Sequence, residues 1–260
     1  MELFEILQAG MKGKDGKELD PTSSEVLESL LDALVDYQPY DLSFQQLRSK
    51  KNIVFKIQIS TKRGKIPELI AKLFVTSGFE RELEVLKRSQ ENALTVPQVI
   101  DAKEGVILMR FIEGNVLTDV VNETFSTTAI EQLAKWYYRF HDIHSLIKGD
   151  PRLRNFIYHN RILYGIDFEE SRPGDWMEDL GGIAASLLDT RPIFHEAKQK
   201  LAWQLLDSYL DSAGLDRNEI IETHFQKTVA NTLKETSRWR ENKTIWTLAK
   251  KIESNGIPKK

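Results

Sequence analysis

The sequence predicts an α+β fold of two lobes, in which a small β-rich lobe is followed by a larger helical one. Short strand-like runs dominate between Tyr40 and Ile112, whereas apolar residues recur at helical spacing over most of the remaining chain. The chain has 260 residues, 41% of them hydrophobic and 29% charged, which suits one large domain or two lobes that share a cleft. We therefore divide it into a helical N-terminal extension at 1–40, a small lobe at 41–112, and a large lobe completed by C-terminal helices at 113–260.

The N-terminal extension is predicted to be helical because a start signal precedes apolar residues at helical spacing. Thr22-Ser23-Ser24-Glu25 has the pattern of a capping box, in which the first and last side chains each bond a backbone N–H group. The apolar residues that follow at helical spacing are Val26, Leu27, Leu30, Leu31, Leu34 and Val35.

The small lobe is predicted to be a three-stranded meander followed by a helix and a further strand. The strand-like runs are separated by polar, turn-like segments. In order, the predicted strands are Leu42–Leu47, Ile53–Ser60 and Leu69–Val75, the helix is Phe79–Arg88, and the last strand is Val106–Ile112.

The large lobe is predicted to be helical apart from one short hairpin. The hairpin would pair Phe156–Tyr158 with Arg161–Asp167 around His159-Asn160. The helices are expected at about 127–145, 176–189, 194–212, 216–236 and 243–253.

Composition excludes several classes of chemistry. The absence of cysteine excludes disulfides, thiolate metal sites and cysteine nucleophiles. The N-terminus lacks the pattern of a signal peptide, and no apolar run approaches the roughly 20 residues of a spanning helix, so we expect a cytoplasmic protein without a membrane span. A net charge of −3 gives no overall attraction to nucleic acids or anionic membranes.

The segment that carries the chemistry runs from Lys148 to Glu169. Asp150 and Asn155 lie five positions apart on one loop, and the predicted hairpin would return Asp167 beside Asn155. Transfer of a phosphoryl group needs an aspartate that orients the acceptor hydroxyl, together with hard oxygen ligands that hold Mg²⁺ against the phosphates. An aspartate followed five residues later by asparagine is common on surface loops, but its coupling to an apolar hairpin ending in Ile-Asp-Phe favours the functional interpretation.

This segment resembles the catalytic loop and metal-binding motif of the protein-kinase-like superfamily. It is most similar to the atypical branch, which includes aminoglycoside phosphotransferases, choline kinases, RIO-type kinases and lipopolysaccharide kinases. The stretch Gly149-Asp150-Pro151, followed by Asn155-Phe156-Ile157, especially resembles lipopolysaccharide heptose kinases. The resemblance covers about residues 41–190 and implies a two-lobed protein-kinase-like fold with ATP and Mg²⁺ as cofactors. It also implies that Asp150 is the catalytic base and that Asn155 and Asp167 are the metal ligands.

A second set of residues supports this interpretation from the small lobe. Lys72 interrupts an apolar strand, where a buried ammonium is costly without a partner, and it resembles the lysine that contacts the α- and β-phosphates. On the following helix, Glu82 lies at the edge of the apolar stripe, whereas Glu80 and Glu84 point away. We therefore expect Glu82 to pair with Lys72; a helix whose acids are all solvated is the alternative.

The adenine site is the least specific part of the pattern. The strand that contains Met109 resembles the final strand before a kinase hinge, with Met109 as the gatekeeper-like residue. Backbone groups from Arg110 through Phe111 to Ile112 would then bond the adenine edge, although a plain core strand would have the same sequence pattern. No Gly-x-Gly-x-x-Gly motif stands between the first two predicted strands, which weakens the protein-kinase subtype more than the fold.

Other side chains near the motif have auxiliary roles in this interpretation. Arg152 and Arg154 follow the catalytic aspartate and are candidates to stabilise the transferring phosphoryl group, because a guanidinium fork suits phosphate oxygens. Asp179 resembles the structural aspartate that braces the catalytic loop. His141 and His144 lack a third metal-type ligand nearby, so packing or loop bracing is favoured over metal binding.

The predicted function is transfer of the γ-phosphoryl group of ATP to a hydroxyl of an acceptor. A small molecule or sugar is favoured, and a protein serine or threonine remains open; the sequence fixes neither the acceptor nor the oligomeric state. One alternative is a pseudokinase that binds a nucleotide or a partner without catalysis. Another is an RNA-directed kinase using basic residues of the small lobe, although nucleic acid is the less expected partner.

Overall fold

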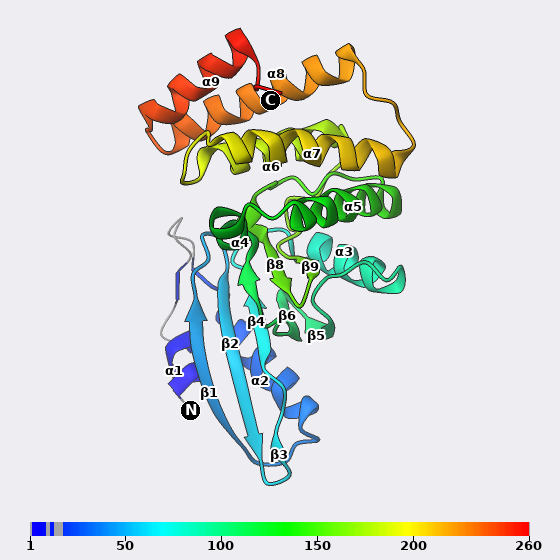
Figure 1. Ribbon diagram of the computed structural model, residues 1–260. Helices are drawn as coiled ribbons and strands as arrows, with labels where there is room; N and C mark the ends of the chain where they lie inside the picture. The colour runs from blue at the N-terminus through cyan, green and yellow to red at the C-terminus, as the bar shows by residue number, and fades with distance from the viewer. Residues whose placement is uncertain (1, 9–10, 13–17, 260) are drawn as a thin grey trace. The chain divides into compact units, whose positions relative to one another are not determined.

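The computed structural model describes residues 2–8, 11–12 and 18–259. The chain forms two compact units, which are described separately below. Unit 1 comprises Met1–Gln90 and Pro97–Ile112, and unit 2 comprises Glu91–Val96 and Glu113–Lys260. Unit 1 holds an antiparallel sheet and unit 2 is mostly helical, as the sequence predicted (Figure 1).

The sheet of unit 1 is antiparallel throughout. Its spatial order is β1 (Tyr40–Leu47), β2 (Ile53–Thr61), β4 (Leu69–Leu73), β6 (Val106–Arg110) and β5 (Val99–Lys103), and the short β3 (Gly64–Lys65) pairs with β2. The predicted meander is therefore present as β1, β2 and β4. The sequence prediction missed β5, whose residues are only partly buried or exposed and whose pairing with β6 contains a register shift.

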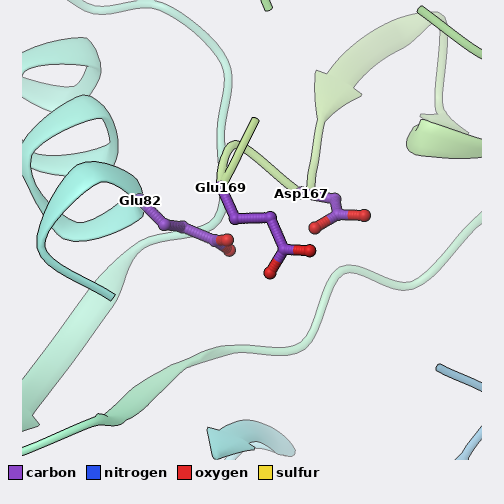
Figure 2. A group of neighbouring side chains, drawn as sticks. All are labelled: Glu82, Asp167 and Glu169. Carbon is purple, nitrogen blue, oxygen red and sulfur yellow. The ribbon is translucent and has the colours of Figure 1, made fainter. Parts of the chain in front are cut away.

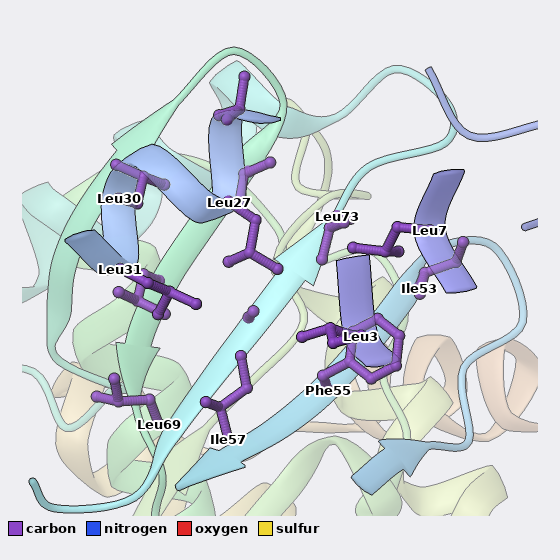
Figure 3. Packing of buried hydrophobic residues seen from close by; sticks show 14 of the residues in the cluster. Leu3, Leu7, Leu27, Leu30, Leu31, Ile53, Phe55, Ile57, Leu69 and Leu73 are labelled. Carbon is purple, nitrogen blue, oxygen red and sulfur yellow. The ribbon is translucent and has the colours of Figure 1, made fainter. Parts of the chain in front are cut away.

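The hydrophobic core of unit 1 lies between this sheet and two N-terminal helices, α1 (Glu2–Gln8) and α2 (Ser23–Leu34). Alternate residues of β2 are buried, as expected of a strand with one face on a core. Figure 3 shows leucines of both helices meeting side chains of β2 and β4. The helices within residues 1–40 are therefore part of this core. Full burial of each such side chain stabilises the fold by on the order of 1.5–3 kcal/mol.

One local prediction for α2 was wrong. The helix begins at Ser23, but its N-cap residue Thr22 has helical dihedral angles and makes no side-chain cap bond. Instead, the Asp20 carboxylate accepts hydrogen bonds from the backbone N–H and the hydroxyl of Thr22, at 2.9 and 2.7 Å. Asp20 therefore organises the entry to the helix in place of the expected capping box.

Unit 2 contains six α-helices among the residues described. They are α4 (Leu117–Thr124), α5 (Thr127–His144), α6 (Trp176–Asp189), α7 (Glu196–Ala213), α8 (Glu219–Trp239) and α9 (Lys243–Asn255). All five predicted helices begin at polar caps whose side chains accept backbone N–H groups, for example Asp175 before α6 and Asn218 before α8. The prediction missed only α4. Within the described part of the chain, no helix is long and apolar enough to span a membrane.

The predicted hairpin is present as β8 (Phe156–His159) and β9 (Ile162–Gly165), but its turn lies one residue later than predicted and β9 ends two residues before Asp167. The short strand β7 (Asn115–Val116) pairs with the outer edge of β8. The turn residues Asn160 and Arg161 both have positive φ, 47° and 62°, which matches the two-residue turns that close tight hairpins. The helix α6 packs directly on the loop before this hairpin, since a Cβ at Gly182 would overlap the ring of Pro151. The glycine thus allows a helix to support the chemistry-bearing loop at close range.

Candidate active site

In unit 1, Lys72 and Glu82 form a buried ion pair. Lys72 Nζ lies 2.6 Å from Glu82 Oε2, and their side chains are only 8% and 3% exposed. Glu82 shares its buried stripe on α3 (Phe79–Glu91) with Val85, Leu86 and Ser89, whereas Glu80 is exposed. The ion pair expected from helix phase is therefore present, and the strand lysine is held in place by a charge of opposite sign.

Backbone N–H groups at and after the end of β6 donate hydrogen bonds within unit 1, which the sequence did not indicate. Met109 is 6% exposed. The Arg110 N–H donates to the Gln98 carbonyl at 2.9 Å, and the Phe111 N–H donates to the Glu68 carbonyl at 3.0 Å. These two N–H groups therefore cannot also donate to an adenine edge, which corrects the expectation that all backbone groups from Arg110 to Ile112 are available.

In unit 2, the Asp150 carboxylate is held by two side chains of its own loop and approached by a third. The Asn155 amide nitrogen donates to Asp150 Oδ2 at 2.9 Å and to its carbonyl at 3.0 Å. Arg152 Nε donates to Asp150 Oδ1 at 2.7 Å, while Arg154 Nη2 lies 3.9 Å from Oδ2. Because Asn155 uses its amide nitrogen here, its amide oxygen is the atom that could face a cation.

The environment keeps Asp150 ionised. Burial by itself raises the pKa of this carboxyl group, but the charge of Arg152 and the hydrogen bonds from Arg152 and Asn155 outweigh burial, so the pKa falls below its ordinary value. At neutral pH the group is a carboxylate, which accepts hydrogen bonds through both oxygens. This suits a residue that orients a hydroxyl group.

The backbone of the same loop is braced by Asp179 of α6. Asp179 is fully buried; its Oδ2 accepts the Lys148 N–H at 2.6 Å, and its Oδ1 accepts the Gly149 N–H at 3.1 Å. His141 Nε2 lies 3.0 Å from the same Oδ2. Gly149 has a φ of 87°, and a Cβ there would overlap the carbonyl of Glu170, so this brace requires glycine. The expected bracing roles of Asp179 and His141 are thus seen directly.

The hairpin returns Asp167 to the same loop. The Ile166 N–H donates to the Asn155 carbonyl at 3.0 Å, which places the next residue, Asp167, beside Asn155. Asp167 has a positive φ of 65°, a conformation that non-glycine residues adopt rarely and mostly where the surroundings enforce it. One carboxylate oxygen of Asp167 and one of Glu169 lie within 4.8 Å of each other, and Figure 2 shows the two side chains. Hard carboxylate oxygens at this spacing could hold a divalent cation.

Sequence reasoning missed two residues of this region. Lys148 is fully buried, and its Nζ donates to the Asp167 carbonyl at 2.6 Å, so it ties the loop of Asp150 to the segment of Asp167. Its position directly before Gly149-Asp150 was the available signal. Glu169 stands two residues after Asp167 in the sequence, and only the return of the hairpin shows that its carboxylate approaches that of Asp167.

The RIO domain is the family that matches this chain, over residues 37–174. The match covers both the lysine strand and the loop and hairpin described above. The chain belongs to the RIO domain family. This RIO domain protein is therefore a kinase, an ATP-dependent phosphotransferase. The RIO-type resemblance drawn from the sequence is confirmed.

Several named proteins share detectable sequence similarity with this RIO domain protein. It is 24% identical over 177 residues to a "Probable serine/threonine-protein kinase BUD32 homolog" of Archaeoglobus fulgidus, covering 68% of this chain and 86% of that one. It is 28% identical over 180 residues to a "Probable bifunctional tRNA threonylcarbamoyladenosine biosynthesis protein" of Methanobrevibacter smithii, covering 66% of this chain but only 31% of that one. It is also 30% identical over 90 residues to the "EKC/KEOPS complex subunit BUD32" of Encephalitozoon cuniculi, covering 34% of this chain and 45% of that one.

Solved structures confirm the protein-kinase-like fold of this RIO domain protein. The amicoumacin kinase hAmiN, solved in complex with AMP-PNP, Ca²⁺ and Ami, has a TM-score of 0.59 at 11% identity, covering 88% of this chain and 96% of that one. A choline/ethanolamine kinase family protein from Mesorhizobium loti has a TM-score of 0.57 at 12% identity, covering 90% and 88%. At these identities the likeness concerns the fold alone.

Proposed function

We propose that this RIO domain protein binds ATP with Mg²⁺ and transfers the γ-phosphoryl group to a hydroxyl that Asp150 orients. The observation that carries the proposal is the fixed Asp150 carboxylate, held by Asn155 and Arg152 on a loop that Lys148 ties to Asp167. Positioned charges of this kind are what phosphoryl transfer requires, because the reaction leaves little covalent chemistry to the protein.

The cation would be held by oxygen atoms of two neighbouring segments. The Asn155 amide oxygen and the Asp167 carboxylate are the proposed ligands, and Glu169 is a further carboxylate within reach of Asp167. These donors fit Mg²⁺, which prefers hard oxygen ligands. When bound, the ion supplies positive charge against the phosphate oxygens.

The nucleotide phosphates would be positioned by Lys72, which Glu82 holds at 2.6 Å. Arg152 would stabilise the transferring phosphoryl group, since its Nε donates to Asp150 while its other guanidinium nitrogens remain for phosphate oxygens. At the adenine end, the Ile112 N–H and the carbonyl groups after Met109 are the proposed partners, because the N–H groups of Arg110 and Phe111 are engaged.

A second candidate for the acceptor is the side-chain hydroxyl of a protein. It is favoured by the relative from Archaeoglobus fulgidus, which is named a serine/threonine-protein kinase and covers 68% of this chain. Two other relatives are named for tRNA threonylcarbamoyladenosine biosynthesis and for a KEOPS complex subunit. A macromolecular partner is therefore a further candidate beside the small-molecule acceptor.

The metal assignment can be tested by substituting Asp167. Asp167→Ala should remove the thermal stabilisation that MgATP gives the wild-type protein, while the unliganded variant stays folded. The reason is that the variant loses a carboxylate ligand but keeps the backbone carbonyl that Lys148 binds. The measurement is a thermal shift with and without MgATP, and Asp142→Asn, at an exposed position of α5, is the control. An unchanged shift in Asp167→Ala would count against the assignment.

A further inference from the structure

The turn between α8 and α9 in unit 2 concentrates positive charge. Residues 238–251 contain five basic residues and one acidic residue, a net charge of +4 in a chain whose net charge is −3. All five basic residues are exposed, and they are Arg238, Arg240, Lys243, Lys250 and Lys251. The overall charge of the chain therefore conceals a local positive field at this turn.

Two tryptophans stand among these charges. Trp239, the last residue of α8, is 85% exposed, and Trp246, the fourth residue of α9, is 38% exposed. Lys243, Trp246 and Lys250 are three and four residues apart, so they share one face of α9. The apolar stripe of the same helix is buried. The indoles are therefore surface groups that the core leaves uncovered.

Side-chain contacts join the end of α8 to this face of α9. The guanidinium carbon of Arg238 lies 6.0 Å from the centre of the Trp246 ring, and Lys250 Nζ lies 5.6 Å from it. Both cations are within range of a cation–π interaction with the indole. Trp239 directly follows Arg238 in the chain. Both indoles thus lie at the same end of the helix pair.

The loop between α6 and α7 extends this region. Arg240 Nη1 lies 2.9 Å from Asp189 Oδ2 at the end of α6, and Lys251 Nζ lies 4.7 Å from the centre of the Phe194 ring. Ile193 of the same loop is 38% exposed. Figure 1 shows the α6–α7 loop and the α8–α9 turn at one end of the helices of unit 2. We use the name basic–apolar surface for the five basic residues together with Ile193, Trp239 and Trp246.

We propose that the basic–apolar surface binds the anionic surface of a lipid bilayer. The basic residues would face anionic headgroups, and the two indoles and Ile193 would enter the headgroup region. Tryptophan is enriched at this depth because it is amphipathic, and lysine and arginine are attracted by the negative potential of anionic lipids. Contact with lipid would also cover apolar side chains that water now surrounds.

The observations favour a lipid surface over single-stranded RNA. Proteins that bind RNA without sequence preference stack successive bases on open aromatic rings, but Arg238 and Lys250 already lie over the Trp246 ring. Ile193 offers no ring to a base, whereas an aliphatic side chain suits the apolar boundary of a bilayer. Because the apolar stripe of α9 is buried, the contact would use the tips of side chains and not an inserted helix.

The test is co-sedimentation of the full chain with vesicles of two compositions. Vesicles of phosphatidylcholine with about 30% phosphatidylserine should bind the wild type, since each basic residue near an anionic surface strengthens binding by on the order of fivefold. Vesicles of phosphatidylcholine alone should bind it at least about tenfold more weakly. Raising the salt concentration to about 0.5 M should weaken binding to the anionic vesicles, because salt screens the attraction.

Two variants of the basic–apolar surface have matched controls on the same helix pair. Trp239→Ala should weaken binding to anionic vesicles at least about fivefold, as loss of a partly buried apolar side chain predicts. Ile220→Ala, which changes an 81% exposed residue at the opposite end of α8, should leave binding unchanged. Lys243→Gln should weaken binding about fivefold, whereas Lys227→Gln, at an exposed lysine within α8, should not. A thermal melt of each variant checks that it is folded.

Each other outcome overturns the inference. Absence of binding to anionic vesicles does so, as does equal binding to the neutral ones. Equal losses in Trp239→Ala and Ile220→Ala would mean that the surface has no particular part in binding. If Trp239→Ala and Lys243→Gln instead weaken binding of a short single-stranded RNA or of polyglutamate while vesicles do not bind, the surface serves a different partner and the lipid assignment fails. ATP turnover without vesicles should be unchanged in all four variants, because none of these residues belongs to the proposed active site.

Discussion

Asp150 shows how neighbouring side chains set the role of one carboxylate. Its pKa is lowered because Arg152 and Asn155 together outweigh the effect of burial. A carboxylate with a lowered pKa is a weak proton acceptor, so its main contribution would be orientation of the acceptor hydroxyl. The direction of the shift also determines how activity depends on acidic pH. Asp150 stays ionised until the pH falls below its ordinary pKa of 3.8, so this group should not limit activity above about pH 5.

The test of this role is Asp150→Asn. We expect phosphoryl transfer to fall by a factor of roughly 10²–10⁴, the usual span for a positioned acid–base group, while MgATP affinity stays nearly unchanged. The amide offers one acceptor oxygen where Arg152 and Asn155 use two, so a loss of about 1–3 kcal/mol in stability is also expected. Transfer or slow ATP hydrolysis is measured beside a thermal melt, and turnover at the wild-type rate would refute the assignment.

At the scale of elements, the phase of α3 relative to β4 decides which acid meets Lys72. The buried stripe contains Glu82 and leaves Glu80 exposed, although the two differ by only two positions. This follows from the period of the helix, because residues two apart point to different faces. The pair Glu80 and Glu82 therefore provides a matched comparison within one turn.

Glu82→Gln should lower activity and Glu80→Gln should leave it unchanged. Loss of the Glu82 charge removes one partner of a buried ion pair, at a cost of about 3–5 kcal/mol in stability. Lys72→Met should lower activity further, since the group that would contact the phosphates is removed. The readouts are the KM for ATP and the rate at saturation. An effect of Glu80→Gln equal to that of Glu82→Gln would contradict the role assigned to the ion pair.

Helices and strands with a clear hydrophobic periodicity or an apolar face were predictable from sequence. Those whose structure depends on packing or pairing with another element were not. The helix α6 was predicted with its observed bounds, because Trp176–Asp189 is apolar at helical spacing and Asp175 caps it. The strand β5 and the helix α4 are short and only partly apolar, so their pairing within the fold decides their structure.

The features of the candidate site likewise fall into those that the sequence predicts and those that depend on packing. Asp150, Asn155 and Asp167 stand in a motif whose spacing can be read along the chain, and Lys72 stands out as a charge in an apolar strand. The approach of Arg240 to Asp189 depends on how α8 packs in unit 2, which no local pattern encodes. The engagement of the Phe111 N–H by the sheet likewise depends on the register between β4 and β6.

At the scale of the whole molecule, two kinds of buried group should shape the dependence of stability on alkaline pH. Lys198 of α7 is fully buried among Asn122, Thr190 and the Arg191 carbonyl, and burial lowers its pKa to about 8. Burial raises the pKa of Tyr137 well above its ordinary value, and that of Tyr40 to about 12. A lowered lysine pKa makes the free energy of unfolding rise with pH, whereas a raised tyrosine pKa makes it fall.

The free energy of unfolding should therefore rise between about pH 8 and 10 and fall at higher pH. Over the lower range, the unfolded chain keeps the Lys198 proton that the folded chain has lost, so stability increases with pH by at most about 1.4 kcal/mol per unit. Above about pH 10 the tyrosines ionise in the unfolded chain but not in the folded one, so stability decreases.

Urea unfolding at pH 7, 8, 9 and 10 measures the rise over the lower range. Lys198→Met is the variant, and Lys200→Met, whose lysine pairs with Glu196 at the surface, is the control. The gain in wild-type stability relative to Lys198→Met should grow with pH across this range, while the difference from Lys200→Met stays constant. A constant difference from Lys198→Met would mean that the buried ammonium keeps its ordinary pKa, and that its four hydrogen-bond acceptors fully offset its burial.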